Sequence, residues 1–181
     1  MEYWFFSDYH FDHNKMAKMR YRGYEDGDVE QMNQDIIDSH NKLVKKSDIV
    51  YCLGDFCWKN NEERMKNFKN QLNGQIHFIL GNHDEPNVVK RVFENVYQYY
   101  DKSFNGVHLF MCHYPMLSWN RSHYNSINVH GHHHSNIVFE KFPGKRLNVA
   151  WEVCGYRPVS LTELLEFAKD QPDNWDIIKN E

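Results

Sequence analysis

Short apolar runs recur along the chain, and each of five runs ends in a polar motif. The runs cover residues 3–6, 49–53, 76–80, 107–112 and 127–129. Each is short and rich in aromatic or β-branched residues, which is typical of a buried strand. In open α/β sheets, ligands bind at the edge formed by the C-terminal ends of the strands. The pattern therefore predicts a site assembled from several strand ends.

The first half of the chain alternates these strands with helical patterns. Apolar residues recur at three- and four-residue spacing over 29–44, which predicts the clearest amphipathic helix. Further helices are predicted over 62–72, ended by Gly74, and over 86–93, opened by Pro86. Alternating strands and helices favour parallel strand pairing.

The second half of the chain consists mainly of strand-like runs joined by short loops, which favours an antiparallel sheet. These runs cover 96–100, 107–112, 127–130, 137–139 and 147–153. Asn105-Gly106 between two of them is a strong hairpin signal. Together the two halves predict an α/β fold in which two mixed sheets face each other and helices lie outside.

A final helix is predicted from Ser160, where Glu163 completes a capping box. Its apolar residues, expected to be buried, are Leu161, Leu164, Leu165 and Phe167. Residues 170–181 are expected to form a loosely docked tail, ordered only if Trp175 and Ile177 pack against the rest. We find no linker or repeat, and expect a single domain over residues 1–181.

Composition narrows the class of protein. The formal net charge of -4 argues against a broad basic face, so extended nucleic-acid binding is not expected. The four cysteines form no CxxC pair, and the first apolar run is too short for a signal peptide. We therefore expect a cytoplasmic protein with no membrane partner. The 12 histidines are the one unusual feature of the composition.

Side chains with the chemistry of metal ligands stand at the five strand ends. They are Asp8, His10, Asp55, Asn82, His113, His132 and His134. Asp8 and His10 are two residues apart, so on a continuing strand both face the same side, and His132 and His134 repeat that spacing. Oxygen and imidazole ligands without thiolates suit manganese, iron, nickel or zinc. Asp55 is an isolated aspartate, the natural ligand to bridge two ions.

Each motif alone has an ordinary structural explanation. Asp8 fits a turn, Asn82 a helix cap, and residues 131–134 a solvated loop. The occurrence of all five motifs in order, each at a strand end, makes that explanation remote.

The series of motifs resembles the calcineurin-like metallophosphoesterase superfamily. The pattern of that family is D-x-H, G-D, G-N-H-[DE], a lone H and G-H-x-H, and this chain matches all five blocks between residues 8 and 134. Residues 148–161 also resemble the closing strand and helix of small bacterial and phage members. The resemblance implies a four-layer α/β/β/α sandwich.

The resemblance also implies roles for individual residues. One metal ion would be bound by Asp8, His10, Asp55 and His134, and a second by Asp55, Asn82, His113 and His132. Manganese is favoured, with iron, zinc or nickel as alternatives, and a hydroxide bridging the ions would be the nucleophile. His83 resembles the family histidine that stabilises the transition state or protonates the leaving oxygen, and Asp84 would orient it.

The chain departs from the family pattern after Asp55. Many members carry a second acid three residues later, where this chain has Trp58. Support for the first metal ion must then come from another residue, and Trp58 is expected to wall the site instead. The arginine that extends this block in protein phosphatases is also missing, which disfavours that activity.

Loops 9–28 and 114–126 flank the predicted site and hold candidates for substrate binding. Arginine and aromatic side chains together suit a phosphate and a base. The alternative is that the aromatic residues pack the loops and Arg121 is solvated. With Trp58 included, the candidates are His13, Arg22, Trp58, Tyr114, Arg121 and His123.

We therefore expect a phosphoesterase that depends on a dinuclear metal centre, favoured as a phosphodiesterase on a small or nucleotide-like substrate. A phosphomonoesterase acting on a small metabolite or nucleotide is the alternative. A nuclease is less favoured because the chain is acidic. A non-catalytic metal-binding scaffold is less favoured because all the ligands and His83 are present.

Overall fold

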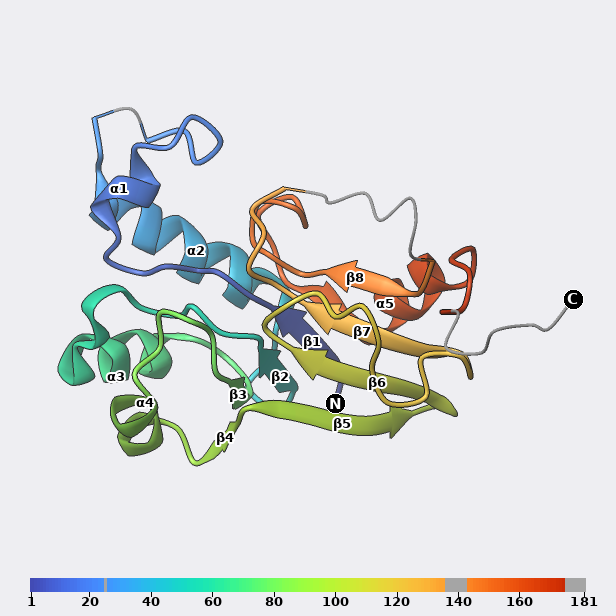
Figure 1. Cartoon of the computed structure of the whole chain (residues 1–181). Helices are drawn as coiled ribbons and strands as arrows, with labels where there is room; N and C mark the ends of the chain where they lie inside the picture. Colours follow the sequence, from blue (N-terminus) through green and yellow to red (C-terminus); the bar gives the residue numbers. More distant parts are fainter. Residues whose placement is uncertain (25, 136–142, 175–181) are drawn as a thin grey trace, which may run out of the picture.

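Two β-sheets face each other at the centre of the molecule, and helices flank them (Figure 1). The computed structural model describes residues 1–24, 26–135 and 143–174. Strand order is β4-β3-β2-β1-β9 in the first sheet and β5-β6-β7-β8 in the second. The predicted α/β architecture of two mixed sheets flanked by helices is confirmed.

The first sheet is parallel except at one edge. β1 (Tyr3–Phe6), β2 (Ile49–Cys52), β3 (Gln75–Ile79) and β4 (Asn95–Tyr97) pair in parallel, and β9 (Val159–Ser160) pairs antiparallel with β1. Phe6 lies opposite Cys52, which lies opposite Phe78. Because these strands run the same way in register, the residues that follow β1, β2 and β3 emerge at one edge of the sheet.

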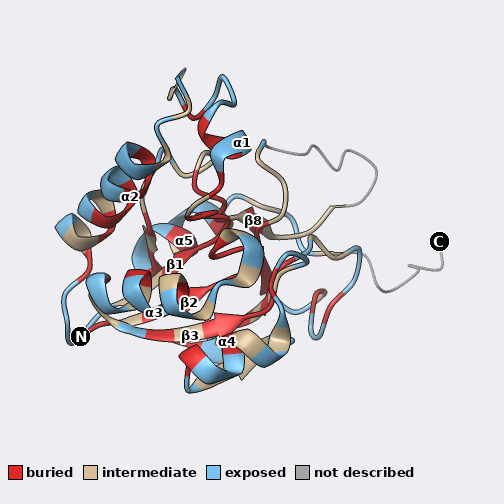
Figure 2. Ribbon diagram, turned by 90° about the vertical axis from the view of Figure 1, so that its left-hand side faces the viewer, coloured by how far each residue is buried: buried red, intermediate tan, exposed pale blue. Residues whose placement is uncertain are grey.

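Three helices cover the outer face of the first sheet. They are α2 (Val29–Leu43), α3 (Glu62–Gln71) and α4 (Pro86–Val92), and their exposed residues lie on the side away from the sheet (Figure 2). Asp28 and Asn61 start α2 and α3, since their side chains accept hydrogen bonds from first-turn backbone amides. The apolar faces of the helices join the buried cluster that includes Phe6 and Phe78.

The second sheet contains one antiparallel and two parallel pairs. β5 (Tyr99–Phe104) and β6 (Val107–Cys112) form the predicted hairpin around Asn105-Gly106. β7 (Ser126–His130) pairs in parallel with β6, and β8 (Arg146–Asn148) in parallel with β7. The antiparallel pairing expected for the second half of the chain is therefore right for β5 with β6 and wrong for β6 with β7 and for β7 with β8.

The long connection between β6 and β7 explains the parallel pairing. Parallel neighbours need a crossover, and residues 113–125 provide it. Trp119 in this segment is buried, packs against the Arg146 guanidinium and donates a hydrogen bond to the Ser126 hydroxyl. Residues 113–125 have no regular hydrophobic periodicity, so the sequence does not predict that they cross the sheet.

Three local expectations also need correction. The run 96–100 splits into β4 and β5, which belong to different sheets, and the run 147–153 keeps strand structure only to Asn148. Phe167 is 54% exposed, because α5 (Leu161–Ala168) turns Leu161 and Leu164 toward the sheets. The predicted strand 137–139, Trp175 and Ile177 lie outside the described residues.

Aromatic and aliphatic side chains fill the space between the two sheets. Phe5 and Tyr51 stack at 5.4 Å between ring centroids and pack with Leu109, Met111 and Val129 of the second sheet. The capping box at Ser160 is present as predicted. None of the helices in the described residues is long and apolar enough to cross a membrane.

The segment after β1 is held in place by polar contacts with two helices. The Asp12 carboxylate accepts hydrogen bonds from Arg64 of α3, at 2.6 Å to both Nε and Nη2, and from Asn33 of α2 at 2.8 Å. The backbone amide of Asp12 donates to Asn33 Oδ1. Beyond it lies the short helix α1 (Asn14–Ala17).

The buried imidazole of His40 makes the stability of the fold depend on pH. Its Nε2 donates to the Asn73 carbonyl and its Nδ1 accepts from the Tyr9 hydroxyl, which is the pattern of a neutral ring. Burial lowers the pKa of His40 from 6.5 to about 4. The unfolded chain therefore takes up this proton first as the pH falls, and stability is lost between pH 6.5 and 4.

We predict that metal-free wild-type protein loses about 3 kcal/mol more unfolding free energy between pH 7 and pH 4 than His40→Gln does, since one pKa unit corresponds to 1.36 kcal/mol. Urea denaturation at a series of pH values measures this difference. Equal losses in the two proteins would show that His40 does not control the pH dependence.

Candidate metal centre

Left-handed backbone conformations deliver the polar residues at the strand ends. Asp8, His10, Asp55 and His132 have φ of 60°, 50°, 54° and 70°. The expectation that strands continue through Asp8–His10 and His132–His134 is therefore wrong, since β1 ends at Phe6 and β7 at His130. Turns of this kind cost non-glycine residues about 1–3 kcal/mol each and concentrate at functional sites.

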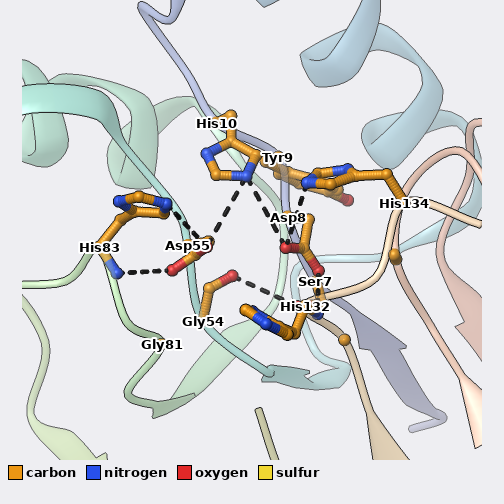
Figure 3. Close-up of polar contacts among 12 residues, drawn as sticks. Ser7, Asp8, Tyr9, His10, Gly54, Asp55, Gly81, His83, His132 and His134 are labelled. Atoms are coloured by element: carbon orange, nitrogen blue, oxygen red, sulfur yellow. Dashed lines mark hydrogen bonds and ion pairs between the residues drawn. The ribbon is translucent and has the colours of Figure 1, made fainter. Parts of the chain in front are cut away.

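One cluster of ligand atoms consists of Asp8, His10 and His134 (Figure 3). Nε2 of His10 lies 3.7 Å from Asp8 Oδ1, and Nε2 of His134 lies 3.9 Å from the same oxygen. Asp8 Oδ1 and His10 Nε2 are buried and have no hydrogen-bond partner among the described residues. Buried polar atoms normally have partners, so these two atoms mark a place where a cation fits.

The carboxylate of Asp55 lies between this cluster and a second one. Its Oδ2 is 3.7 Å from His10 Nε2 and 3.5 Å from His113 Nε2. Its Oδ1 accepts a hydrogen bond from the His83 backbone amide at 2.9 Å. One oxygen of Asp55 is thus held by the protein, while the other faces imidazoles on two sides.

Asn82, His113 and His132 form the second cluster. Asn82 Oδ1 lies 3.0 Å from His113 Nε2 and 2.8 Å from His132 Nδ1. Nδ1 of His113 lies 2.6 Å from the Leu53 carbonyl and must donate to it, so the lone pair of a neutral His113 ring is on Nε2. That lone pair faces the amide oxygen of Asn82, an arrangement that a bound cation would stabilise.

Two glycines of the motifs allow the backbones to approach these carboxylates. A Cβ atom on Gly81 would lie 2.3 Å from Asp55 Oδ1, and one on Gly131 would lie 2.5 Å from Asp8 Oδ2 and 2.0 Å from the Ser7 hydroxyl. Any larger residue would push the carboxylates out of place. The glycines of G-N-H-D and G-H-x-H are thus required because there is no space for a side chain beside the carboxylates.

Electrostatics favour the metal-binding forms of Asp8 and His132. Burial raises the pKa of Asp8, but the nearby imidazoles of His10 and His113 outweigh burial and hold that pKa far below its usual value. Burial and the neighbouring His113 and His133 lower the pKa of His132. Metal ligands must be an ionised carboxylate and neutral imidazoles, so both shifts act in the required direction.

The structure places Asp84 in a different role from the one expected. Its Oδ2 accepts hydrogen bonds from the backbone amides of Gly81 and Asp55, each at 2.8 Å, and its Oδ1 accepts from Phe56. The carboxylate is therefore directed at backbone amides rather than at the His83 ring. Asp84 fastens the third strand end to the second, because backbone donors from both converge on it.

His83 lies beside the clusters without being buried in them. Its Nε2 is 4.0 Å from Asp55 Oδ2, and its side chain is 46% exposed. The Asn60 side chain donates a hydrogen bond to the His83 carbonyl, and the Asp55 carboxylate accepts one from the His83 amide. These contacts fix the His83 backbone against the residues that follow β2. The ring is thus free to meet a bound ligand.

Arg22 was expected to contact substrate, and the structure contradicts this. Its side chain is buried and its guanidinium donates to the Asp8 carbonyl at 2.7 Å, to the Tyr9 carbonyl at 3.1 Å and to Glu152. Sequence reasoning missed Glu152 altogether. The signal that could have identified it is its position as a single acid between Trp151 and Val153, inside an otherwise apolar run.

The remaining substrate candidates divide into two groups. Trp58, which precedes Lys59 in the short 3-10 helix η1 (Trp58–Asn60), stacks on His13 at 3.9 Å and lies 5.4 Å from the His83 ring. His13 is buried and accepts from the Met16 amide. Tyr114 is 43% exposed and lies 4.8 Å from the His132 ring. These three residues border the clusters.

Arg121 and His123 lie away from the clusters. The neighbouring Asn120 contacts His108, at the opposite end of β6 from His113. At about 3.3 Å per residue this end is roughly 16 Å from the metal ligands. The ring of His123 packs on Tyr124 at 4.1 Å instead. The expectation that these two residues touch substrate is not supported by their positions.

Comparison with known proteins shows the family to which this fold belongs. A family model described as the calcineurin-like phosphoesterase superfamily domain matches residues 1–150. The chain belongs to this superfamily.

Relatives of similar length are known from archaea and phages. An uncharacterized protein of Methanocaldococcus jannaschii is 36% identical over 161 residues, covering 86% of this chain and 84% of its own. The gene 66 protein of Mycobacterium phage L5 is 25% identical, covering 90% and 92%. A crystal structure of an Aquifex aeolicus protein of unknown function has the same fold, with a TM-score of 0.70 at 24% identity and coverage of 92% and 98%.

Because Asp84 accepts hydrogen bonds from three backbone amides, two of them buried, we predict that Asp84→Ala lowers the unfolding free energy by at least about 2 kcal/mol, at 1–3 kcal/mol per unsatisfied buried group. Chemical denaturation of the metal-free protein measures this loss. Asp38→Ala, which removes an exposed aspartate of α2, is the control and should change stability by less than about 0.5 kcal/mol. Equal stabilities of the two variants would contradict the role of Asp84.

Proposed function

We propose that the two clusters hold two divalent metal ions that share Asp55. The observation that carries this proposal is the position of Asp55 Oδ2, 3.7 Å from His10 Nε2 and 3.5 Å from His113 Nε2. Asp8, His10 and His134 complete the first site, and Asn82, His113 and His132 complete the second. The unpartnered Asp8 Oδ1 and His10 Nε2 support the fit of a cation in the first site.

The donor set favours manganese, with iron, zinc and nickel as alternatives. Carboxylate, amide and imidazole ligands suit hard or borderline divalent ions. Two such ions would supply four positive charges against the two carboxylates of Asp8 and Asp55, and would polarise a phosphoryl group and activate water. An anionic phosphoester is the substrate that such a net positive site attracts.

We assign to His83 the protonation of the leaving oxygen. Its ring is next to the shared carboxylate and half-exposed, so it is within reach of a phosphoester held between the ions. Hydrolysis of a phosphodiester breaks one P–O bond and expels an alkoxide, and a proton donated to that oxygen turns it into the better leaving group, an alcohol. Asp84 supports this role indirectly, because it holds the turn from which His83 projects.

The surroundings of the site favour a phosphodiester over a monoester. A monoester dianion commonly binds an additional arginine or lysine. Arg22 does not offer its guanidinium to a phosphate, because it is committed to backbone carbonyls and Glu152. Trp58 beside His83 and Tyr114 beside His132 offer aromatic faces, which fit a small or nucleotide-like substrate.

We predict that the purified protein with manganese hydrolyses bis-nitrophenyl phosphate faster than mono-nitrophenyl phosphate. Release of nitrophenolate measures both rates. A faster rate on the monoester would replace the diesterase proposal with a phosphomonoesterase, and no turnover of either ester by metal-loaded protein would contradict hydrolysis. Parallel assays on 2′,3′-cyclic and 3′,5′-cyclic nucleotides test the nucleotide-like substrate.

His83→Ala should lower kcat on a diester that releases an alkoxide, such as a cyclic nucleotide, by about 100- to 10,000-fold, as loss of a general acid does, while both metal ions remain bound. Release of nitrophenolate, which leaves without a proton, should be slowed far less. Steady-state kinetics and metal analysis of the same preparation test the two statements together. His123→Ala, on the distant loop, serves as the control. Loss of metal from His83→Ala would make this histidine a ligand instead of an acid.

A further inference from the structure

We propose that Arg22 and Glu152 form a buried clamp that positions Asp8 and His134, the ligands of the first metal ion. This inference rests on the metal assignment of the proposed function. Neither Arg22 nor Glu152 is proposed as a metal ligand. Both act by holding Asp8 and His134, which are.

The guanidinium of Arg22 fixes the strand end that carries Asp8. Nη2 donates to the Asp8 carbonyl at 2.7 Å and Nη1 to the Tyr9 carbonyl at 3.1 Å. The left-handed turn at Asp8 directs these carbonyls away from the sheet hydrogen bonds, and Arg22 satisfies both. The arginine side chain is only 1% exposed, so its charge needs a partner within the protein.

Glu152 is that partner, and it joins Arg22 to His134. Its Oε1 accepts from Arg22 Nε, and its Oε2 accepts from His134 Nδ1 at 3.0 Å. A carboxylate at Nδ1 keeps the proton there and presents the lone pair of Nε2, which faces Asp8 Oδ1 at 3.9 Å. One ion pair therefore orients ligands from two different strand ends.

The clamp supplies the support for the first metal ion that many family members obtain from an acid at the position of Trp58. Glu152 comes from the turn after β8, far along the chain from Asp55, but lies against the same ion site. The second ion has no equivalent at His113, whose Nδ1 is paired with the neutral carbonyl of Leu53. Since an anionic partner makes an imidazole a stronger ligand, the first site should bind its ion more tightly than the second.

The loop that carries Arg22 is itself fastened over His134. The Tyr21 ring lies parallel to the His134 ring, at 6.0 Å and 18°. The Tyr156 hydroxyl donates to the Tyr21 carbonyl, and the Tyr156 carbonyl accepts from Ser39 of α2 at 2.6 Å. The clamp is thus held in position by α2 and by the turn that carries Glu152.

Metal titration of Glu152→Gln tests the clamp without relying on activity. Gln keeps the volume but removes the charge, so manganese affinity of the first site should fall about 10- to 100-fold while the second site keeps its affinity. Isothermal titration with manganese, with bound metal counted after dialysis, measures both. Glu62→Gln is the matched control, because it disrupts an exposed pair with Arg91 at 2.6 Å.

A double-mutant cycle with His134→Ala separates positioning from general destabilisation. Because Glu152 contacts His134 directly, most of the effect of Glu152→Gln on metal affinity should disappear once His134 is removed, and the remainder is the part transmitted through Arg22 to Asp8. Full additivity of the two effects would overturn the proposal. Glu152→Gln that binds both ions with wild-type affinity would also overturn it.

One further variant separates loss of metal affinity from loss of folding. Arg22→Met combined with Glu152→Gln leaves no unpaired buried charge, and should fold yet still bind the first ion weakly. Wild-type affinity in this folded double variant would overturn the clamp. Failure of wild-type protein to bind two ions would instead overturn the proposed function and this inference with it, whereas metal-loaded protein without hydrolytic activity would contradict the hydrolase alone.

Discussion

The structure depends on how the charges of three buried carboxylates are balanced at one edge of the first sheet. Asp84 is balanced by backbone amides of Gly81, Asp55 and Phe56. Asp55 and Asp8 each use one oxygen for a backbone amide, from His83 and His132 respectively, and turn the other oxygen toward imidazoles. In Asp8 and Asp55, one carboxylate oxygen is thus satisfied by a backbone amide, and the other is the atom to which a proposed cation would bind.

This balance explains why irregular backbone and glycines are concentrated at the strand ends. A strand that simply continued would point alternate side chains away from the centre and keep its amides in the sheet. Left-handed turns at Asp8, Asp55 and His132 free amides and redirect side chains at the same time. The cost in backbone strain is offset by hydrogen bonds to carboxylates, which are stronger than those to neutral acceptors.

The sequence predicted most of the architecture because local patterns control it. Strands β1, β2, β3 and β6, the helices α2 to α5 and the capping box at Ser160 follow from periodicity and end signals. The parallel pairing of β6 with β7 did not, since it depends on residues 113–125 crossing the sheet, which involves contacts such as Trp119 with Arg146. The course of a chain without periodicity is decided by packing between distant segments.

For the candidate site, the sequence by itself predicted which residues come together, because short motifs place a fixed ligand type directly after each strand. The seven predicted ligands lie together, and His83 lies beside them. Only the tertiary structure decided what supports them. It turned Asp84 toward backbone amides, buried Arg22 instead of exposing it to substrate, and brought Glu152 to His134. The physical reason is that a supporting residue needs only to reach its partner in space, so no spacing along the chain records it.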